Sequence, residues 1–127
     1  ATDAADELLS PPESLGVLDR ALNRVLAVGA QDVTGGTLVL AGADQGYVPT
    51  VEQLEAARTP RTTALVFVSP SNPTGAVYSP EETEAVGRWA LDRGLWVITD
   101  EIYEHLTYDG MPFTSIVRAV PELAEQP

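Results

Sequence analysis

The chain has 127 residues, 44% of them hydrophobic and 20% charged, which is typical of a single globular domain and excludes a disordered protein. Nineteen acidic residues against seven basic ones give a formal net charge of −12, so nucleic acid and anionic membranes are excluded as expected partners. Because the sequence has no cysteine, it has neither disulfides nor thiolate metal sites.

The N-terminal part of the sequence predicts a loose leader followed by a helix. Residues 1–9 are acidic and contain no apolar run, so we expect no signal peptide and a cytoplasmic location. Ser10 and Glu13 form a capping-box pattern, and Leu and Val residues then recur at spacings of three and four. These features predict an amphipathic helix that begins at Ser10 and ends near Gly29.

Three further elements are predicted in the middle of the chain. Residues 37–41, TLVLA, form an apolar run that indicates a short strand, and a loop over 42–49 follows it. Thr50 and Gln53 repeat the capping pattern and predict the start of a second helix. Residues 64–68, ALVFV, form a continuous apolar run, which is typical of a strand covered on both faces.

Another strand is predicted one helix later. Residues 79–82 carry a third capping pattern, and Trp89 belongs to the buried stripe of the helix that follows. Residues 95–99, LWVIT, form a second continuous apolar run, which predicts a strand. We expect Trp96 of this strand to lie in the core. Strand, helix and strand with short connections form a βαβ unit with parallel strands. The fold class is therefore α/β, with a mostly parallel sheet and flanking helices in three layers. Only three strands are predicted, so we expect the chain to be part of something larger.

Polar side chains follow both strands of this unit at their carboxyl ends, where ligands collect in open α/β sheets. Asn72 lies in the loop SPSNPTG after the first strand, and Asp100 and Tyr103 lie in DEIY after the second. An amide, a carboxylate and a phenol at one rim can hold a polar ligand with an aromatic ring. Taken singly, each has a simpler interpretation: Asn is a common turn residue, Asp caps turns, and a lone Tyr is commonly half-buried.

Two other polar residues near this rim are given structural roles. Glu101 is expected to point away from the rim rather than to form a carboxylate pair with Asp100. His105 is the only histidine, and we expect it on the surface of a short helix. Because no second histidine or cysteine accompanies it, no metal site is predicted.

The combination of SPSNPTG with TDEIYEHLTYDG one helix later resembles the class I/II aminotransferases, the fold type I enzymes that use pyridoxal 5'-phosphate (PLP). Within that family, it looks most like the bacterial aspartate aminotransferases. The resemblance runs from about Thr50 to Glu125 and is weak before Gly46. It implies that residues 1–127 form a single α/β domain that corresponds to the central part of the family's large, PLP-binding domain.

The resemblance implies a role for each rim residue. Asn72 matches the asparagine that donates a hydrogen bond to the phenolic oxygen of PLP, and its bond to Pro73 is expected to be cis. Asp100 matches the aspartate that pairs with the pyridine nitrogen and keeps it protonated, so that the ring accepts electrons from the substrate's α-carbon. Tyr103 matches the tyrosine that also hydrogen-bonds the phenolic oxygen. The implied substrates are an amino acid and a 2-oxo acid.

One residue type that the family requires is absent from the sequence. All seven basic residues are arginines, whereas the family's catalytic residue is a lysine that forms a Schiff base with PLP. In the family, this lysine lies on the next strand, and the arginine that holds the substrate carboxylate lies further on. We therefore predict cofactor-binding residues but no catalytic residue, and no activity for this chain by itself.

Three hypotheses are open at this point. The chain is a piece of an aminotransferase large domain, a lysine-free binding or interaction module that reuses the βαβ unit, or an unrelated doubly wound nucleotide-binding domain. The third is disfavoured because neither GxGxxG nor a phosphate-binding loop with GK[ST] follows a strand. The first implies a homodimer, because the family's active sites form across a homodimer interface.

Overall fold

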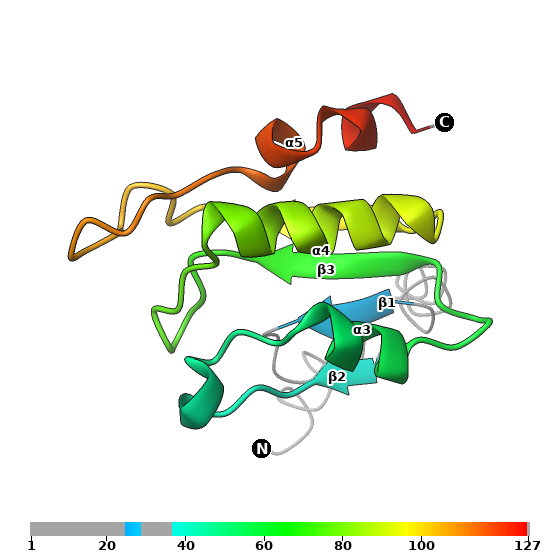
Figure 1. The fold of residues 1–127 in the computed structure, drawn as a ribbon, viewed down its shortest axis with the longest axis horizontal. Helices are drawn as coiled ribbons and strands as arrows, with labels where there is room; N and C mark the ends of the chain where they lie inside the picture. Colours follow the sequence, from blue (N-terminus) through cyan, green and yellow to red (C-terminus); the bar gives the residue numbers. More distant parts are fainter. Residues whose placement is uncertain (1–24, 29–36, 127) are drawn as a thin grey trace, which may run out of the picture.

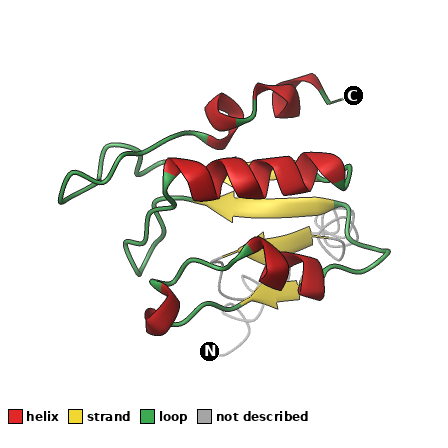
Figure 2. Cartoon of the chain, viewed as in Figure 1, coloured by secondary structure: helices red, strands yellow, loops and turns green. Residues whose placement is uncertain are grey.

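A computed structural model describes residues 25–28 and 37–126 of the chain (Figure 1). The elements are strand β1 (Val25–Val28), strand β2 (Thr37–Val39), 3-10 helix η1 (Ala43–Gln45), helix α3 (Val51–Ala57), strand β3 (Ala64–Val68), helix α4 (Pro80–Asp92), strand β4 (Trp96–Asp100), helix α5 (Ile116–Ala119) and 3-10 helix η2 (Pro121–Glu125). Figure 2 shows the sheet with its helices, which confirms the α/β class. Within the described ranges, no helix is both long and apolar enough to cross a membrane.

The strands form one four-stranded parallel sheet in the order β2-β1-β3-β4. The three predicted strands are all present, and β3 has the predicted bounds. In the pair formed by β3 and the edge strand β4, Val66 lies beside Ile98 and Val68 beside Asp100. The predicted parallel pairing of the βαβ unit is therefore confirmed.

The fourth strand, β1, contradicts the prediction of a helix that continues to Gly29. Val25–Val28 is a strand that pairs with β2 on one side and with β3 on the other. The run VLAV is short and has a β-branched residue at each end, so it suits a strand as well as a helix, and the two neighbouring strands decide between them. The preceding part of that predicted helix and the leader 1–9 lie outside the described residues.

Both longer helices begin at the capping boxes that the sequence predicts. Thr50 Oγ1 accepts a hydrogen bond from Gln53 N at 3.3 Å, and Gln53 Oε1 accepts one from Thr50 N at 2.8 Å. Ser79 and Glu82 exchange the same two bonds at 3.1 and 2.7 Å before α4. After α4, Gly94 has φ +64°, the left-handed conformation that commonly ends a helix.

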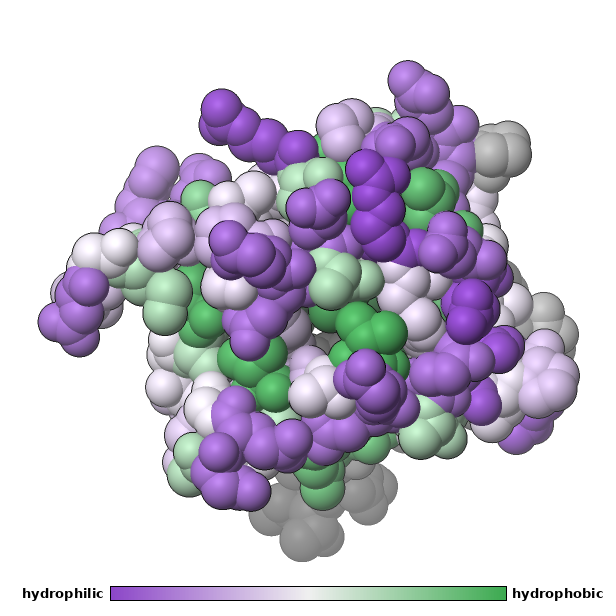
Figure 3. Space-filling model, in the orientation of Figure 1, coloured by the Kyte–Doolittle hydropathy of each residue, from purple (hydrophilic) through white to green (hydrophobic). Residues whose placement is uncertain are grey.

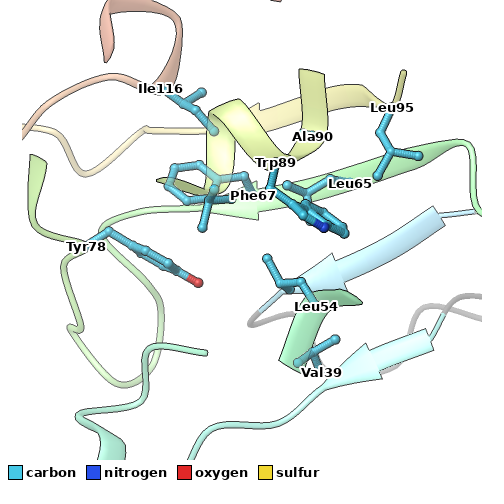
Figure 4. Close-up of a cluster of buried hydrophobic side chains, with 10 residues drawn as sticks. Val39, Leu54, Leu65, Phe67, Tyr78, Trp89, Ala90, Leu95 and Ile116 are labelled. Carbon is cyan, nitrogen blue, oxygen red and sulfur yellow. The ribbon is translucent and has the colours of Figure 1, made fainter. Parts of the chain in front are cut away.

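Helices α3 and α4 lie over the same face of the sheet, and the core is between them and β3 (Figures 1 and 4). Leu65 and Phe67 of β3 are fully buried on this face. They pack with Leu54 from α3 and Trp89 from α4, whose exposed fractions are 0% and 5%. This packing fixes β3, and with it the start of the loop SPSNPTG.

One carboxylate joins α3 to α4. Glu55 accepts hydrogen bonds from Arg58 Nη2 at 2.7 Å, from Trp89 Nε1 at 2.8 Å and from Arg93 Nε at 3.1 Å. These bonds lower the pKa of Glu55 to about 2 because they stabilise its ionised form, and the bond from Arg58 has the largest effect. Glu55 therefore holds together the two helices that cover the sheet.

The opposite face of the sheet is open in the part of the chain that the structure describes. Trp96 and Ile98 of β4 are 53% and 51% exposed, and Leu38 of β2 is 42% exposed. The prediction that Trp96 lies in the core is therefore wrong. Successive strand residues point to opposite faces, so Trp96 points away from α4, and no described helix covers it. Of the three expected layers, the described residues form two.

Candidate functional site

The loops after β3 and β4 begin side by side at the carboxyl edge of the sheet. Val68 and Asp100 form the last register pair of the two strands, and Ser69 N donates a hydrogen bond to the Asp100 carbonyl oxygen at 3.2 Å. Because the strands are parallel, both loops leave the sheet in the same direction. The carboxyl ends of parallel strands are the edge at which ligands bind in open α/β sheets.

The loop after β3 is held in shape by bonds between its own residues. Gly75 N donates to the Ser71 carbonyl oxygen at 2.8 Å, and Ser71 N donates to the Ala76 carbonyl oxygen at 2.9 Å. The peptide bond between Asn72 and Pro73 is cis, as expected. The two backbone bonds close the turn, and the Asn72 side chain remains exposed.

Asn72 and Tyr103 meet across the two loops. Nδ2 of Asn72 donates a hydrogen bond to the Tyr103 hydroxyl at 3.4 Å, although the residues are 31 positions apart in sequence. Asn72 is exposed and Tyr103 is half-buried. An acceptor atom beside this pair is therefore within reach of an amide N–H and a phenol O–H together.

The same two side chains line a hollow of about 240 Å³. The rest of its wall comes from the β3 loop and from Leu106 and Tyr108, which are 52% and 74% exposed. None of the lining residues is basic. The hollow is below the usual range of about 300–1,000 Å³ for small-molecule pockets, so it is one wall of a site rather than a whole pocket. Leu106 and Tyr108 both lie within the motif TDEIYEHLTYDG, but sequence analysis does not single them out as site residues.

Asp100 lies at the same edge but is not among the residues that line this hollow. Its side chain is exposed, and Oδ1 accepts a hydrogen bond from Ile102 N at 3.1 Å. This bond is the turn-capping role that an Asp at a strand end can have. Among the described residues, no hydrogen bond joins Asp100 to the side chain of Asn72 or Tyr103. The structure thus brings two of the three predicted residues into contact and holds the third at the neighbouring strand end.

Two nearby polar residues have structural partners. Glu101 turns toward α5 and not toward Asp100, because its Oε1 accepts a hydrogen bond from Ile116 N at 3.0 Å. The His105 side chain is 91% exposed and lies 3.4 Å from Glu104, in a turn instead of the predicted helix. The described residues contain no cluster of His, Cys, Asp or Glu that could hold a metal ion.

A second hollow, of about 510 Å³, lies between α4 and the segment that enters and begins α3. Figure 3 shows apolar side chains exposed over this part of the surface with hydrophilic ones around them. Its arginines are already paired, Arg88 with Glu122 at 2.7 Å and Arg93 with Glu55 at 3.1 Å. It contains none of the predicted site residues, so the candidate site remains the edge beyond β3 and β4.

A sequence profile described as aminotransferase class I and II matches residues 34–127. The chain belongs to the class I and II aminotransferase family. The resemblance inferred from SPSNPTG and DEIY is thus confirmed, and it begins closer to the N-terminus than these motifs indicated. Aminotransferases of this family are PLP-dependent and act on amino acids and 2-oxo acids.

This aminotransferase chain covers only part of its relatives. The aspartate aminotransferase of Streptomyces avermitilis is 58% identical over 96 residues, which are 74% of this chain and 24% of that protein. The one from Geobacillus stearothermophilus is 46% identical over 96 residues, with the same coverage. A solved double mutant of the Thermus thermophilus aspartate aminotransferase is 39% identical with a TM-score of 0.68, and the match covers 87% of this chain and 32% of that one. The chain spans about a quarter of the length of the curated relatives it matches.

The chemistry of the rim fits the ring of PLP but not its phosphate. The 3.4 Å approach of the Asn72 amide to the Tyr103 hydroxyl suits a phenolic oxygen, which accepts hydrogen bonds. The exposed Asp100 carboxylate suits a protonated ring nitrogen, since a nearby anion favours the charged form of a base. Cationic side chains are the strong partners of a phosphate, and the wall of the hollow contains no basic residue.

Proposed function

We propose that this chain supplies the ring-binding wall of a PLP site in an aminotransferase that transfers amino groups between an amino acid and a 2-oxo acid. The observation that carries the proposal is the 3.4 Å contact between Asn72 Nδ2 and the Tyr103 hydroxyl. It brings two hydrogen-bonding groups together from separate loops, beside the strand end that bears Asp100. When bound, PLP supplies a protonated pyridine ring that accepts electrons from the substrate's α-carbon.

Each of the three residues has its own part in this proposal. The Asn72 amide and the Tyr103 hydroxyl donate hydrogen bonds to the phenolic oxygen, and the Asp100 carboxylate holds the proton on the ring nitrogen. Hydrogen bonds between charged groups are about twice as strong as neutral ones, so we assign Asp100 the largest share of ring binding. None of the three is proposed as a catalytic residue.

The remaining parts of the site are proposed to come from outside the printed sequence. These are the lysine, the groups that hold the phosphate and the arginine that holds the substrate carboxylate. The absence of lysine from all 127 residues supports this division, as does the absence of basic residues from the wall of the hollow. We further propose that residues 1–127 belong to one α/β domain, and that the protein acts in the cytoplasm as a homodimer.

A second candidate function is a binding or interaction module that keeps the fold but not the reaction. The lysine-free composition is the observation that favours it. The two candidates differ in one respect that an experiment can measure. The aminotransferase site requires the rim to bind PLP through Asp100, whereas a module with a new role has no such requirement.

Titration of the purified chain with PLP, followed by the absorbance of the cofactor, tests the first proposal. We expect a saturable shift of the PLP band, with affinity about two- to tenfold lower in Asn72→Ala, the effect of one neutral hydrogen bond. Asp100→Ala should lower it by more than about tenfold, because a charged partner is lost. Glu104→Ala is the matched control, since this exposed carboxylate lies on the same loop and contacts His105. An affinity that is unchanged in Asp100→Ala, or no shift with the wild-type chain, would contradict the proposal.

Borohydride reduction tests the assignment of no catalytic residue. A chain of this sequence with a blocked α-amino group has no primary amine, since it contains no lysine. We therefore expect no increase in protein mass after incubation with PLP and reduction. A stable cofactor adduct on the chain would contradict this assignment.

A further inference from the structure

Glu101 connects the candidate cofactor site to the C-terminal part of the fold. It follows Asp100 directly, and its half-buried carboxylate accepts hydrogen bonds at Oε1 from Thr99 Oγ1 at 3.1 Å and from Ile116 N at 3.0 Å. We infer that Glu101 is a positioning residue that ties the turn following Asp100, the last residue of β4, to the N-terminus of α5. The inference rests on the proposed PLP site and adds to it a residue that does not touch the cofactor.

The first step of the argument is that α5 is a firm attachment point. Ile116 and Val120 are both fully buried, and they lie against α4 where Gly87 leaves room for them. A Cβ atom at Gly87 would be 2.8 Å from Val120 Cγ2, so α5 rests almost on the α4 backbone. Figure 4 shows Ile116 in the core, beside α4. A bond to Ile116 N is therefore a bond to a packed element.

The second step is that the turn itself has little packing to hold it. The side chain of Ile102 is 77% exposed, and Glu104 and His105 are exposed as well. Segments with few buried apolar contacts open locally at low free-energy cost. Hydrogen bonds are therefore needed to fix this turn. The bond from Ile116 N to Glu101 connects the turn to α5, which is packed against α4.

The third step concerns the Asp100 carboxylate. Its Oδ1 accepts a hydrogen bond from Ile102 N at 3.1 Å, and Glu101 is the residue between these two groups. A displacement of Glu101 therefore changes the distance between the carboxylate and this N–H. The Ile102 amide proton is a direct reporter of where the Asp100 carboxylate lies.

The competing explanation is that Glu101 serves α5 alone. Ser115, the N-cap residue of α5, makes no side-chain capping bond, and Glu101 satisfies the Ile116 amide in its place. Under this explanation, loss of the carboxylate frays α5 and leaves the Asp100 turn as it was. The two explanations predict different behaviour at Ile102 and the same behaviour at Ile116.

Residue-resolved amide hydrogen exchange and PLP titration of the same variants decide between them. In Glu101→Ala, we expect exchange at Ile116 and Ile102 to become faster by on the order of tenfold, the effect of losing a charge-assisted hydrogen bond. PLP affinity should fall by a similar factor. Glu101→Gln keeps an oxygen acceptor, so it should restore both properties to within about threefold of wild type. Glu104→Ala, a carboxylate on the same turn, should change neither.

The outcomes separate this inference from the function on which it rests. Faster exchange at Ile116 alone, with PLP affinity unchanged, would overturn the inference and leave the PLP site standing. Faster exchange at both amides in Glu101→Ala, together with no PLP shift in the wild-type chain, would support the tether and overturn the proposed function. Failure of Glu101→Gln to restore the Ile102 amide would also count against the tether.

Discussion

Replacement of Gly87 by alanine tests how closely α5 approaches α4. Gly87 is a buried residue within α4, and the methyl group of an alanine there would lie 2.8 Å from Val120 Cγ2 and 3.3 Å from Ile116 Cγ1. The first distance is shorter than any ordinary contact between carbon atoms. Something must therefore move when this methyl group is added.

Two opposing effects set the size of the change. Alanine is favoured over glycine in a helix interior by about 1 kcal/mol, whereas an extra methyl group in a packed site costs about 1–3 kcal/mol. Val120 is β-branched and fully buried, so its methyl group cannot rotate away freely. The second effect therefore prevails, and we expect Gly87→Ala to lower the free energy of unfolding by about 1 kcal/mol.

Equilibrium unfolding in urea, followed by circular dichroism, measures this change in a double-mutant cycle with Val120→Ala. Removal of Cγ2 takes away the closest contact, and the remaining 3.3 Å contacts require only small shifts. In that background, Gly87→Ala should become stabilising, by up to about 1 kcal/mol, because the helix propensity then prevails. An equal effect in both backgrounds would refute the argument that the close approach of Val120 is the reason for glycine at this position.

Two further predictions concern the surface of the fold. The pKa of Glu55 is about 2 against an ordinary 4.5, so its ionised form stabilises the fold above pH 4.5 and this contribution is lost as the pH falls toward 2. Glu55→Gln should flatten the pH dependence of the unfolding midpoint in that window. Trp96→Thr should reduce self-association of the isolated chain in sedimentation, because it removes an indole that is 53% exposed on the open face; an unchanged sedimentation profile would contradict this reasoning.

Short sequence patterns were sufficient to predict the helices and strands between Thr50 and Asp100. A capping box is complete within four residues, so Thr50 and Ser79 mark the starts of α3 and α4 before any tertiary contact is considered. The loop SPSNPTG and the motif DEIY likewise sufficed to infer the family, because motif, spacing and intervening helix lie in one continuous stretch.

Where a sequence pattern is compatible with two structures, the sequence did not show which of them forms. The apolar run Val25–Val28 can be buried in a helix or in a strand, and pairing with both β2 and β3 makes it a strand. An apolar residue in a strand faces whichever layer is present, so Trp96 was assigned to the core although no described element covers it. Both errors concern the surroundings of a segment in the assembled fold: the strands beside Val25–Val28 and the layer that covers, or leaves open, the face of Trp96.

For the candidate site, the residues themselves determined which chemical groups stand at the two strand ends: an amide, a carboxylate and a phenol. Tertiary structure alone decided that Asn72 contacts Tyr103 across 31 positions, and that Glu101 reaches Ile116 across 15. The physical reason is that these contacts depend on the register of β3 with β4 and on the packing of α5 against α4. Register and packing are properties of the assembled layers, and the local patterns of the sequence do not specify them.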